Sequence, residues 1–282
     1  MPRITVNHIS IHYQERGDIA NPTIVMVHGL GCSLKYWDCV FDAPVFSSYR
    51  LISLDLPGFG GSEKPNSYDY RFETQAAMIF DVLDALRARD VILVGHSMGG
   101  AIAILMALQR PEALRQLIVV EPNLRAGDAQ LSKRIVSYAN ETNFIARYEE
   151  FRDLAITLVT GWFVRFHQAD LDEYIDELLQ ATPISMYRSA RSLISVTTDP
   201  QFIQQFRQLP LNKHFLIGEE TLKQRPALKE LLGQNVDTVI VPGVGHMMMV
   251  DDPTIFTQTL AHILLKDRLQ ETLHGGRNDS FD

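Results

Sequence analysis

The stretch VILVGHSMGG, Val91 to Gly100, places a serine between an apolar segment and a pair of glycines. The residues before it have the composition of a buried strand, and AIAILMAL at 101–108 has that of a buried helix. The pattern G-x-S-x-G between a strand and a helix is typical of a nucleophile on a sharp turn, where only small neighbours fit. The helix N-terminus there favours developing negative charge. The sequence therefore predicts that Ser97 is a nucleophile; the alternative is a serine that merely caps the helix.

Six apolar, strand-like segments recur along the chain, at residues 23–29, 49–57, 90–95, 115–122, 213–220 and 237–243. Their nearly continuous apolar character is typical of parallel strands covered on both faces. Stretches with helical periodicity lie between them. This alternation predicts an α/β fold, with a mostly parallel sheet flanked by helices and joined by right-handed crossovers.

One long segment, residues 124–209, has helix-like patterning and no convincing strand. We therefore expect a core domain in two parts, residues 1–123 and 210–266, with a helical cap at 124–209 inserted between two sheet strands. The tail at 267–282 ends in HGGRNDSFD, which is polar without periodicity, so we expect it to be disordered.

The bulk composition narrows the function classes. Of 282 residues, 46% are hydrophobic and 21% charged, as in an ordinary soluble globule. The net charge of −8 argues against nucleic acid or an anionic membrane as partner. The first residues alternate apolar and polar side chains, the longest apolar run is too short to cross a bilayer and no C-x-x-C pair occurs, so we expect a cytoplasmic protein without a signal peptide. No metal-ligand or nucleotide motif occurs, which predicts neither a metal nor a cofactor. Nothing indicates a homo-oligomer.

A serine nucleophile needs a general base, and His246 has the most suitable surroundings of the nine histidines. It ends the glycine-containing stretch VPGVGH, residues 241–246, just after the last apolar strand and before the last helix. A histidine in such a loop can also be an ordinary surface residue. Because it follows Ser97 in the chain order expected of a serine hydrolase, we predict that it is the base.

Four motifs together resemble the α/β-hydrolase superfamily: HGLG at 28–31, DLPGFGGS at 55–62, GHSMGG at 95–100 and PGVGH at 242–246. The resemblance covers residues 20–266. It implies a hydrolase in which the backbone amides of Leu30 and Met98 form the oxyanion hole. It also implies that His28 is a structural hydrogen-bonding residue and not a second base.

The acid partner departs from the family pattern. Relatives usually carry an aspartate after the strand at 213–218, in the pattern G-x-x-D, but this position holds Thr221. Glu220 could act from one residue earlier. Glu121, at the end of the apolar run LIVVE, resembles the acid position of haloalkane dehalogenases. An acid that orients an imidazole should be fixed and partly buried, so we favour Glu121 and keep Glu220 as the alternative. The remaining possibilities are Glu219, Asp199 and a dyad without an acid.

Aromatic residues in the predicted cap and methionines beside His246 indicate an apolar pocket, although each alone could equally belong to a core. The candidate pocket residues are Trp37, Trp162 and Met247. Haloalkane dehalogenases and epoxide hydrolases of this fold use an aspartate nucleophile, so Ser97 argues against both.

The predicted function is cleavage of a carboxylic ester, including a thioester or lactone, of a small and largely apolar substrate through an acyl-enzyme on Ser97. A carbon–carbon bond hydrolase with the same three residues is one alternative, and perhydrolase or haloperoxidase activity is another. A ligand-binding receptor of the same fold, with weak catalysis, is the non-enzymatic alternative, and an interaction module without a pocket is the last.

Overall fold

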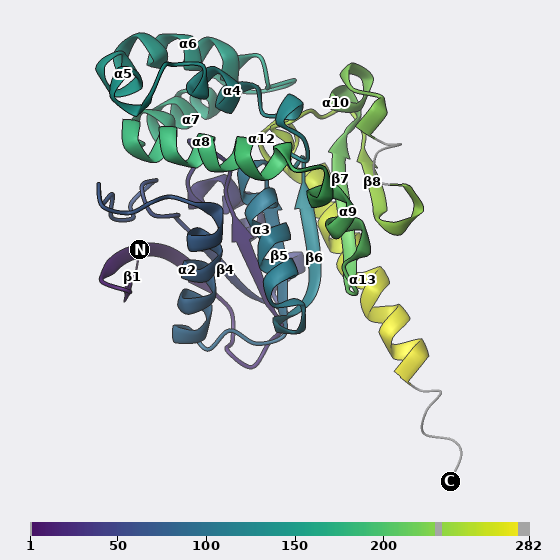
Figure 1. Ribbon diagram of the computed structural model, residues 1–282. Coiled ribbons are helices and arrows are strands. Elements are labelled where there is room, and N and C mark those ends of the chain that lie inside the picture. Colours follow the sequence, from purple (N-terminus) through teal and green to yellow (C-terminus); the bar gives the residue numbers. More distant parts are fainter. Residues whose placement is uncertain (1, 229–232, 276–282) are drawn as a thin grey trace.

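The computed structural model describes residues 2–228 and 233–275 and contains an eight-stranded sheet with helices on both faces (Figure 1). The strands are β1 (Arg3–Val6), β2 (Ile9–Arg16), β3 (Thr23–Val27), β4 (Arg50–Leu54), β5 (Val91–His96), β6 (Leu114–Val120), β7 (Asn212–Gly218) and β8 (Asp237–Val241). Their order is β1-β2-β4-β3-β5-β6-β7-β8. β1 and β2 are antiparallel, and neighbouring strands from β4 to β8 are parallel. The predicted α/β fold is confirmed.

The following helices belong to the core domain. They are α1 (Asp38–Asp42), α2 (Phe72–Ala85), α3 (Met98–Gln109), α10 (Glu219–Gln224), α12 (Met248–Asp251) and α13 (Pro253–Gly275). The connection from β3 to β4 crosses the sheet in one direction, and those from β4 to β5 and from β5 to β6 cross in the other. Right-handed crossovers therefore put α2 and α3 on one face, while α1, which contacts α13, lies on the opposite face.

The segment between β6 and β7 is helical. It contains α4 (Gln130–Val136), α5 (Glu141–Ala146), α6 (Tyr148–Thr160), α7 (Gln168–Gln180), α8 (Pro183–Thr198) and α9 (Pro200–Gln208). Helices α4 to α8 lie together over one end of the sheet (Figure 1). The last helix, α9, leaves this group and packs against α3, so the cap ends in space before the predicted boundary at residue 209.

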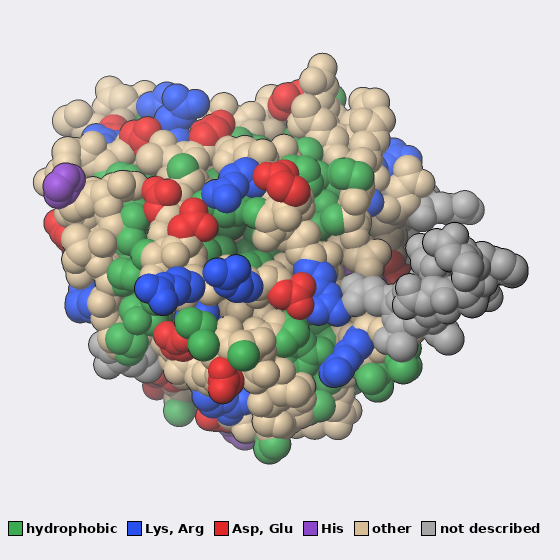
Figure 2. Space-filling model, turned by 90° about the horizontal axis from the view of Figure 1, so that it is seen from below, with side chains coloured by type: hydrophobic (Ala, Val, Ile, Leu, Met, Phe, Trp, Pro, Cys, Tyr) green, Lys and Arg blue, Asp and Glu red, His purple; other side chains and the backbone are tan. Residues whose placement is uncertain are grey.

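Helix α13 extends past the predicted end of the core at residue 266 and continues to Gly275. The residues after that boundary, such as Arg268 and Gln270, are good helix formers. Asp267 is also buried against the sheet, where it accepts hydrogen bonds from Gln116 at 2.7 Å and from the His214 ring at 2.6 Å. The start of the tail is therefore corrected; residues 276–282 lie outside the described residues. On the face away from the cap, basic and acidic side chains are interspersed (Figure 2).

Glu177 of α7 joins the cap to the core through a buried carboxyl group. Its Oε1 accepts a hydrogen bond of 2.5 Å from the hydroxyl of Ser33, in the loop after β3. Burial raises the pKa of this carboxyl to about 7, although the Ser33 hydrogen bond acts in the opposite direction. The neighbouring pair of Lys35 and Glu173, 2.7 Å apart, is exposed. The protonation state of Glu177 therefore matters for how firmly the cap is held.

We expect the free energy of unfolding to fall as the pH rises from about 4.3, the ordinary pKa of glutamate, to about 7. In this interval the folded protein holds a proton at Glu177 that the unfolded chain has released, so raising the pH favours unfolding. Glu177→Gln is expected to remove this dependence of the free energy of unfolding on pH. Urea titrations between about pH 4 and about pH 8 measure the dependence, with the exposed Glu173→Gln as matched control. An unaltered slope in Glu177→Gln would contradict the assignment.

Candidate active site

Ser97 lies on a strained turn between β5 and α3. Its backbone has φ 51°, in the left-handed region that few non-glycine residues adopt, and its N–H donates to the Val120 carbonyl. Gly99 makes the turn possible, because a Cβ there would lie 2.3 Å from the carbonyl oxygen of Val27. The predicted turn geometry around the serine is present, and it holds the side chain at the carboxyl end of the sheet.

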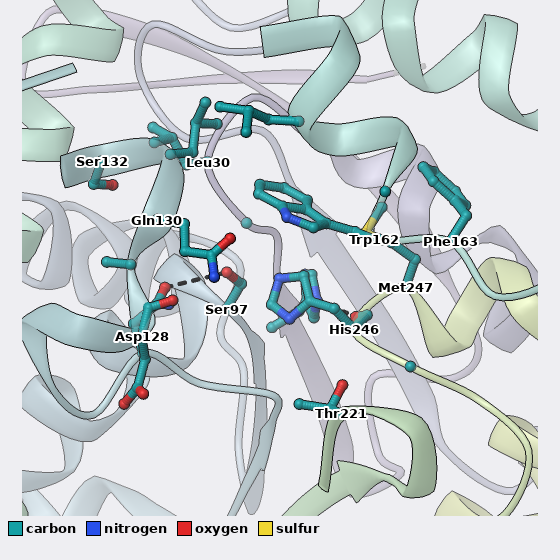
Figure 3. Close-up of a pocket in the computed structure, with 18 of the residues that line it drawn as sticks. Leu30, Ser97, Asp128, Gln130, Ser132, Trp162, Phe163, Thr221, His246 and Met247 are labelled. Carbon is teal, nitrogen blue, oxygen red and sulfur yellow. Dashed lines mark hydrogen bonds between the residues drawn. The ribbon is translucent and has the colours of Figure 1, made fainter. Parts of the chain in front are cut away.

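A cavity of about 440 Å³ lies between the cap and the carboxyl ends of the strands, and Ser97 and His246 both line it. Figure 3 shows their side chains pointing toward one another in the middle of the site. Further lining residues come from the cap and from the loops after β3, β6 and β7, and they include Leu30, Asn123, Gln130, Trp162 and Thr221. The structure thus brings together residues that are about 150 positions apart in the sequence.

His246 is held by its neighbours on two sides. The Nε2 of His96 donates to the His246 carbonyl oxygen at 3.0 Å, and the two rings lie 4.8 Å apart. Burial, followed by the charge of His246, lowers the pKa of His96 well below its usual range, so His96 is a neutral hydrogen-bond donor. On another side, the indole of Trp162 meets the His246 ring edge-on, with centroids 5.2 Å apart. These contacts of His96 with His246 were not predicted from the sequence.

Glu121 is the carboxylate that the structure places beside His246. It follows β6 with φ 48°, and its Oε2 lies 3.6 Å from the Nδ1 of His246. Its Oε1 accepts the backbone N–H of Gly218 at 2.7 Å, and the residue is only 5% exposed. A buried carboxylate with one oxygen fixed by the backbone can orient an imidazole through the other. The Nε2 of His246 is then left for the serine.

The other candidate acids lie in different surroundings. Glu220 lines the cavity, but its Oε1 pairs with Lys223 at 2.7 Å on the partly exposed first turn of α10. Glu219 accepts the backbone N–H of Gly243, and Asp199 caps α9 by accepting the N–H of Gln201. Thr221, at the position where the family pattern has an aspartate, is buried and lies next to His246 in Figure 3.

Asn123 contacts Ser97, and this contact was not predicted from the sequence. The Ser97 hydroxyl donates to Asn123 Oδ1 at 3.2 Å, and the Asn123 amide nitrogen donates to the Asp128 carbonyl, also at 3.2 Å. Among residues 2–228 and 233–275, Asn123 and not the imidazole is the hydrogen-bond partner of this hydroxyl. Hydrogen bonds between nucleophile and base are often formed only once substrate binds. The one sequence signal was an asparagine two residues after Glu121 at a strand end.

The two predicted oxyanion amides lie on either side of the serine. Leu30 lines the cavity, and Met98 is the first residue of α3, directly after Ser97. Within the described part of the chain, neither N–H donates to another protein group. His28 has the structural position expected of it, because its Nδ1 donates to the Gly29 carbonyl and its Nε2 accepts the N–H of Leu56.

The three predicted pocket residues separate into two groups. Trp162 and Met247 line the cavity. Trp37 does not: it is completely buried and packs against Phe256 of α13, with ring centroids 6.2 Å apart. The short helix Leu34–Trp37 follows the loop that carries Leu30 but turns the indole of Trp37 into the core, which the sequence pattern did not reveal.

Asp251 links the cap to the loop that carries His246. Its Oδ1 accepts the backbone N–H groups of Val164 and Arg165 in the cap, at 2.7 and 3.0 Å, and its Oδ2 accepts that of Gly245 at 2.8 Å. Burial raises the pKa of this carboxyl against the effect of the three donors. Asp252 caps the following helix by accepting the N–H of Ile255 at 2.9 Å.

No group of three or more histidine, cysteine or acidic side chains is placed to hold a metal ion among residues 2–228 and 233–275. In the same part of the chain, no helix combines the length and apolar character required to cross a membrane.

Comparison with known proteins gives relatives of several kinds. The chain is 34% identical over 118 residues to the uncharacterized hydrolase YugF of Bacillus subtilis, a match that covers 42% of this chain and 43% of that protein. It is 29% identical over 259 residues to a 2-succinyl-6-hydroxy-2,4-cyclohexadiene-1-carboxylate synthase of Klebsiella pneumoniae, covering 89% and 96% of the two chains. A putative aryl esterase from Burkholderia cenocepacia has a similar structure, with a TM-score of 0.75, 19% identity and coverage of 94% and 98%.

The family model described as the alpha/beta hydrolase fold matches residues 22–253, which is most of the chain and includes Ser97, Glu121 and His246. The structure of the aryl esterase, at 19% identity, is evidence for the fold alone. That fold agrees with the parallel sheet and the order of its strands. The protein belongs to the alpha/beta hydrolase fold family.

Proposed function

We propose that the protein is a serine hydrolase that cleaves carboxylic esters, including thioesters and lactones, of small substrates. The observation that carries this proposal is that Ser97 and His246 line one cavity, while the buried Glu121 places its Oε2 3.6 Å from the Nδ1 of His246. A binding protein would need neither the strained serine nor the buried carboxylate.

The proposed reaction has two halves. The Oγ of Ser97 forms a bond to the ester carbonyl carbon while the Nε2 of His246 takes the proton of Ser97. The carbonyl oxygen gains the negative charge. The amides of Leu30 and Met98 stabilise that charge. The bond to the leaving oxygen then breaks, that oxygen takes the proton from His246, and the acyl group stays on Ser97. A water molecule activated by His246 releases the acid by the same steps.

The test combines turnover with labelling. Wild-type protein is offered p-nitrophenyl esters from acetate to decanoate and, separately, a fluorophosphonate, with the labelled residue located by mass spectrometry. Turnover together with a label on Ser97 is the expected result. A protein that hydrolyses none of these esters and whose Ser97 is not labelled is not a serine hydrolase. Labelling without turnover would mean that Ser97 is reactive but that these simple esters are not substrates.

A second candidate function is a reaction on a cyclic carboxylate, as the name of the relative of similar length indicates for that protein. One observation favours it: Arg225 lines the cavity, and no ion pair of its guanidinium occurs in the described part of the chain. Benzoate should then protect Ser97 from the fluorophosphonate in wild type but not in Arg225→Gln, and benzamide should protect neither. Equal protection by benzoate and benzamide would remove this candidate.

A further inference from the structure

We propose that the cavity selects esters or lactones whose acyl part carries a hydrogen-bond donor, a hydroxyl or an amide N–H, close to the scissile carbonyl, and whose leaving group is apolar. This inference rests on the ester hydrolysis proposed above. It follows from two contacts within the same cavity: the polar side chain of Asn123 lies against Ser97, and the indole of Trp162 lies against His246.

The orientation of the Asn123 amide is determined by its partners. The oxygen and nitrogen of such an amide are distinguished by what each one faces. One end faces the carbonyl oxygen of Asp128 at 3.2 Å, which can only accept, so this end must be the NH₂ group. Asp128 is itself fixed, because its Oδ2 accepts the N–H of Arg125 at 3.1 Å. The Oδ1 of Asn123 therefore faces the cavity side, and the hydroxyl of Ser97 must donate to it.

Catalysis removes the donor that Asn123 has in the structure. Once the Ser97 proton has passed to His246 and its oxygen is bonded to the acyl carbon, Ser97 has no hydrogen left to donate. Asn123 is only 6% exposed, so bulk water replaces this donor poorly. A buried acceptor without a donor destabilises the acyl-enzyme and the transition state that leads to it, which lowers the rate of hydrolysis by a factor of about ten or more. An acyl group with its own donor near the carbonyl restores the lost hydrogen bond.

The leaving group is assigned to the opposite side of the site. Its oxygen takes a proton from His246, so it must lie on the side of the imidazole. Two neighbours of His246 there are apolar, since the Trp162 ring lies 5.2 Å away and Met247 is the next residue, while Thr221 is a polar neighbour. Figure 3 shows the same division, with Gln130 and Ser132 on the side of Ser97 and Trp162 and Met247 on the side of His246. The acyl group is therefore assigned to the side of Ser97, where Asn123, Gln130 and Ser132 line the cavity.

The test compares two esters of equal shape, p-nitrophenyl 3-hydroxybutanoate and p-nitrophenyl 3-methylbutanoate, which differ by a hydroxyl in place of a methyl group. The ratio of their kcat/KM values is divided by the ratio of their hydroxide-catalysed rates. For wild type we expect the hydroxy ester to be preferred by about tenfold or more. In Asn123→Leu, which has similar volume and no acceptor, the preference should fall to within about twofold.

Controls separate this inference from the function on which it rests. Asn66→Leu, at an exposed position outside the cavity, should keep the wild-type preference. Labelling of Ser97 by the fluorophosphonate and the thermal midpoint show whether Asn123→Leu is folded. If it is not, the two esters on wild type decide: equal corrected rates overturn the inference. A wild type that turns over neither ester and is not labelled contradicts the proposed function instead.

Discussion

Replacing Ser97 with alanine is expected to lower kcat/KM for p-nitrophenyl esters by about 10⁴- to 10⁶-fold. Alanine removes the oxygen that forms the covalent bond, so that only water attack remains, assisted by the oxyanion amides. The alanine side chain is smaller than serine and leaves Gly99 and its close approach to Val27 unchanged. The loss should therefore appear in kcat, with the thermal midpoint nearly unaltered.

Steady-state kinetics and mass spectrometry measure this loss. The fluorophosphonate adduct should disappear together with the activity. Ser137→Ala, at an exposed position after α4, is the matched control and should keep both. Activity in Ser97→Ala within tenfold of wild type would mean that another group is the nucleophile and that the function proposed here is wrong.

Glu121→Gln is expected to lower kcat by about 10²- to 10⁴-fold, with a smaller effect on KM. The glutamine oxygen can still accept the N–H of Gly218, so the local backbone keeps its partner. Its NH₂ group then faces His246 Nδ1, where the carboxylate stood, and favours the tautomer with a proton on Nε2. An imidazole protonated on Nε2 cannot take the proton of Ser97.

Glu220→Gln is the matched control, because it removes a cavity-lining carboxylate that pairs with Lys223 and not with His246. Its kcat should stay well above that of Glu121→Gln. Kinetics of both variants, with urea titrations to confirm folding, decide between the two acids. A larger loss of kcat in Glu220→Gln than in Glu121→Gln would mean that Glu220 of α10 is the acid and that Glu121 is not.

Much of the fold could be predicted because its signals are local. Each strand from β3 to β8 coincides with an apolar run, and the turn at Ser97 is specified by glycines whose absence of a side chain is required by close backbone contacts. The end of α13 was placed too early, because the buried Asp267 is held by side chains of β6 and β7 that are distant in the sequence.

The candidate site was harder to predict from the sequence, because its residues follow different strands and come together only when the sheet forms. Glu121 and Glu220 both follow parallel strands, and only the orientation of each side chain separates them: one reaches the imidazole and the other pairs with Lys223. Trp37 was wrongly expected at the pocket, since its sequence position says nothing of the direction of its indole. Asn123 was missed because an asparagine at a strand end is common in loops of any kind.

Asp251 connects a segment of the cap to the loop that carries His246 through a single side chain. The same carboxylate binds the backbone of Val164 and Arg165 in the cap and of Gly245 beside His246. Moving that cap segment outward would take away two of its three donors and loosen the residue next to the histidine. One carboxylate therefore ties the position of this cap segment to the position of the loop that carries His246.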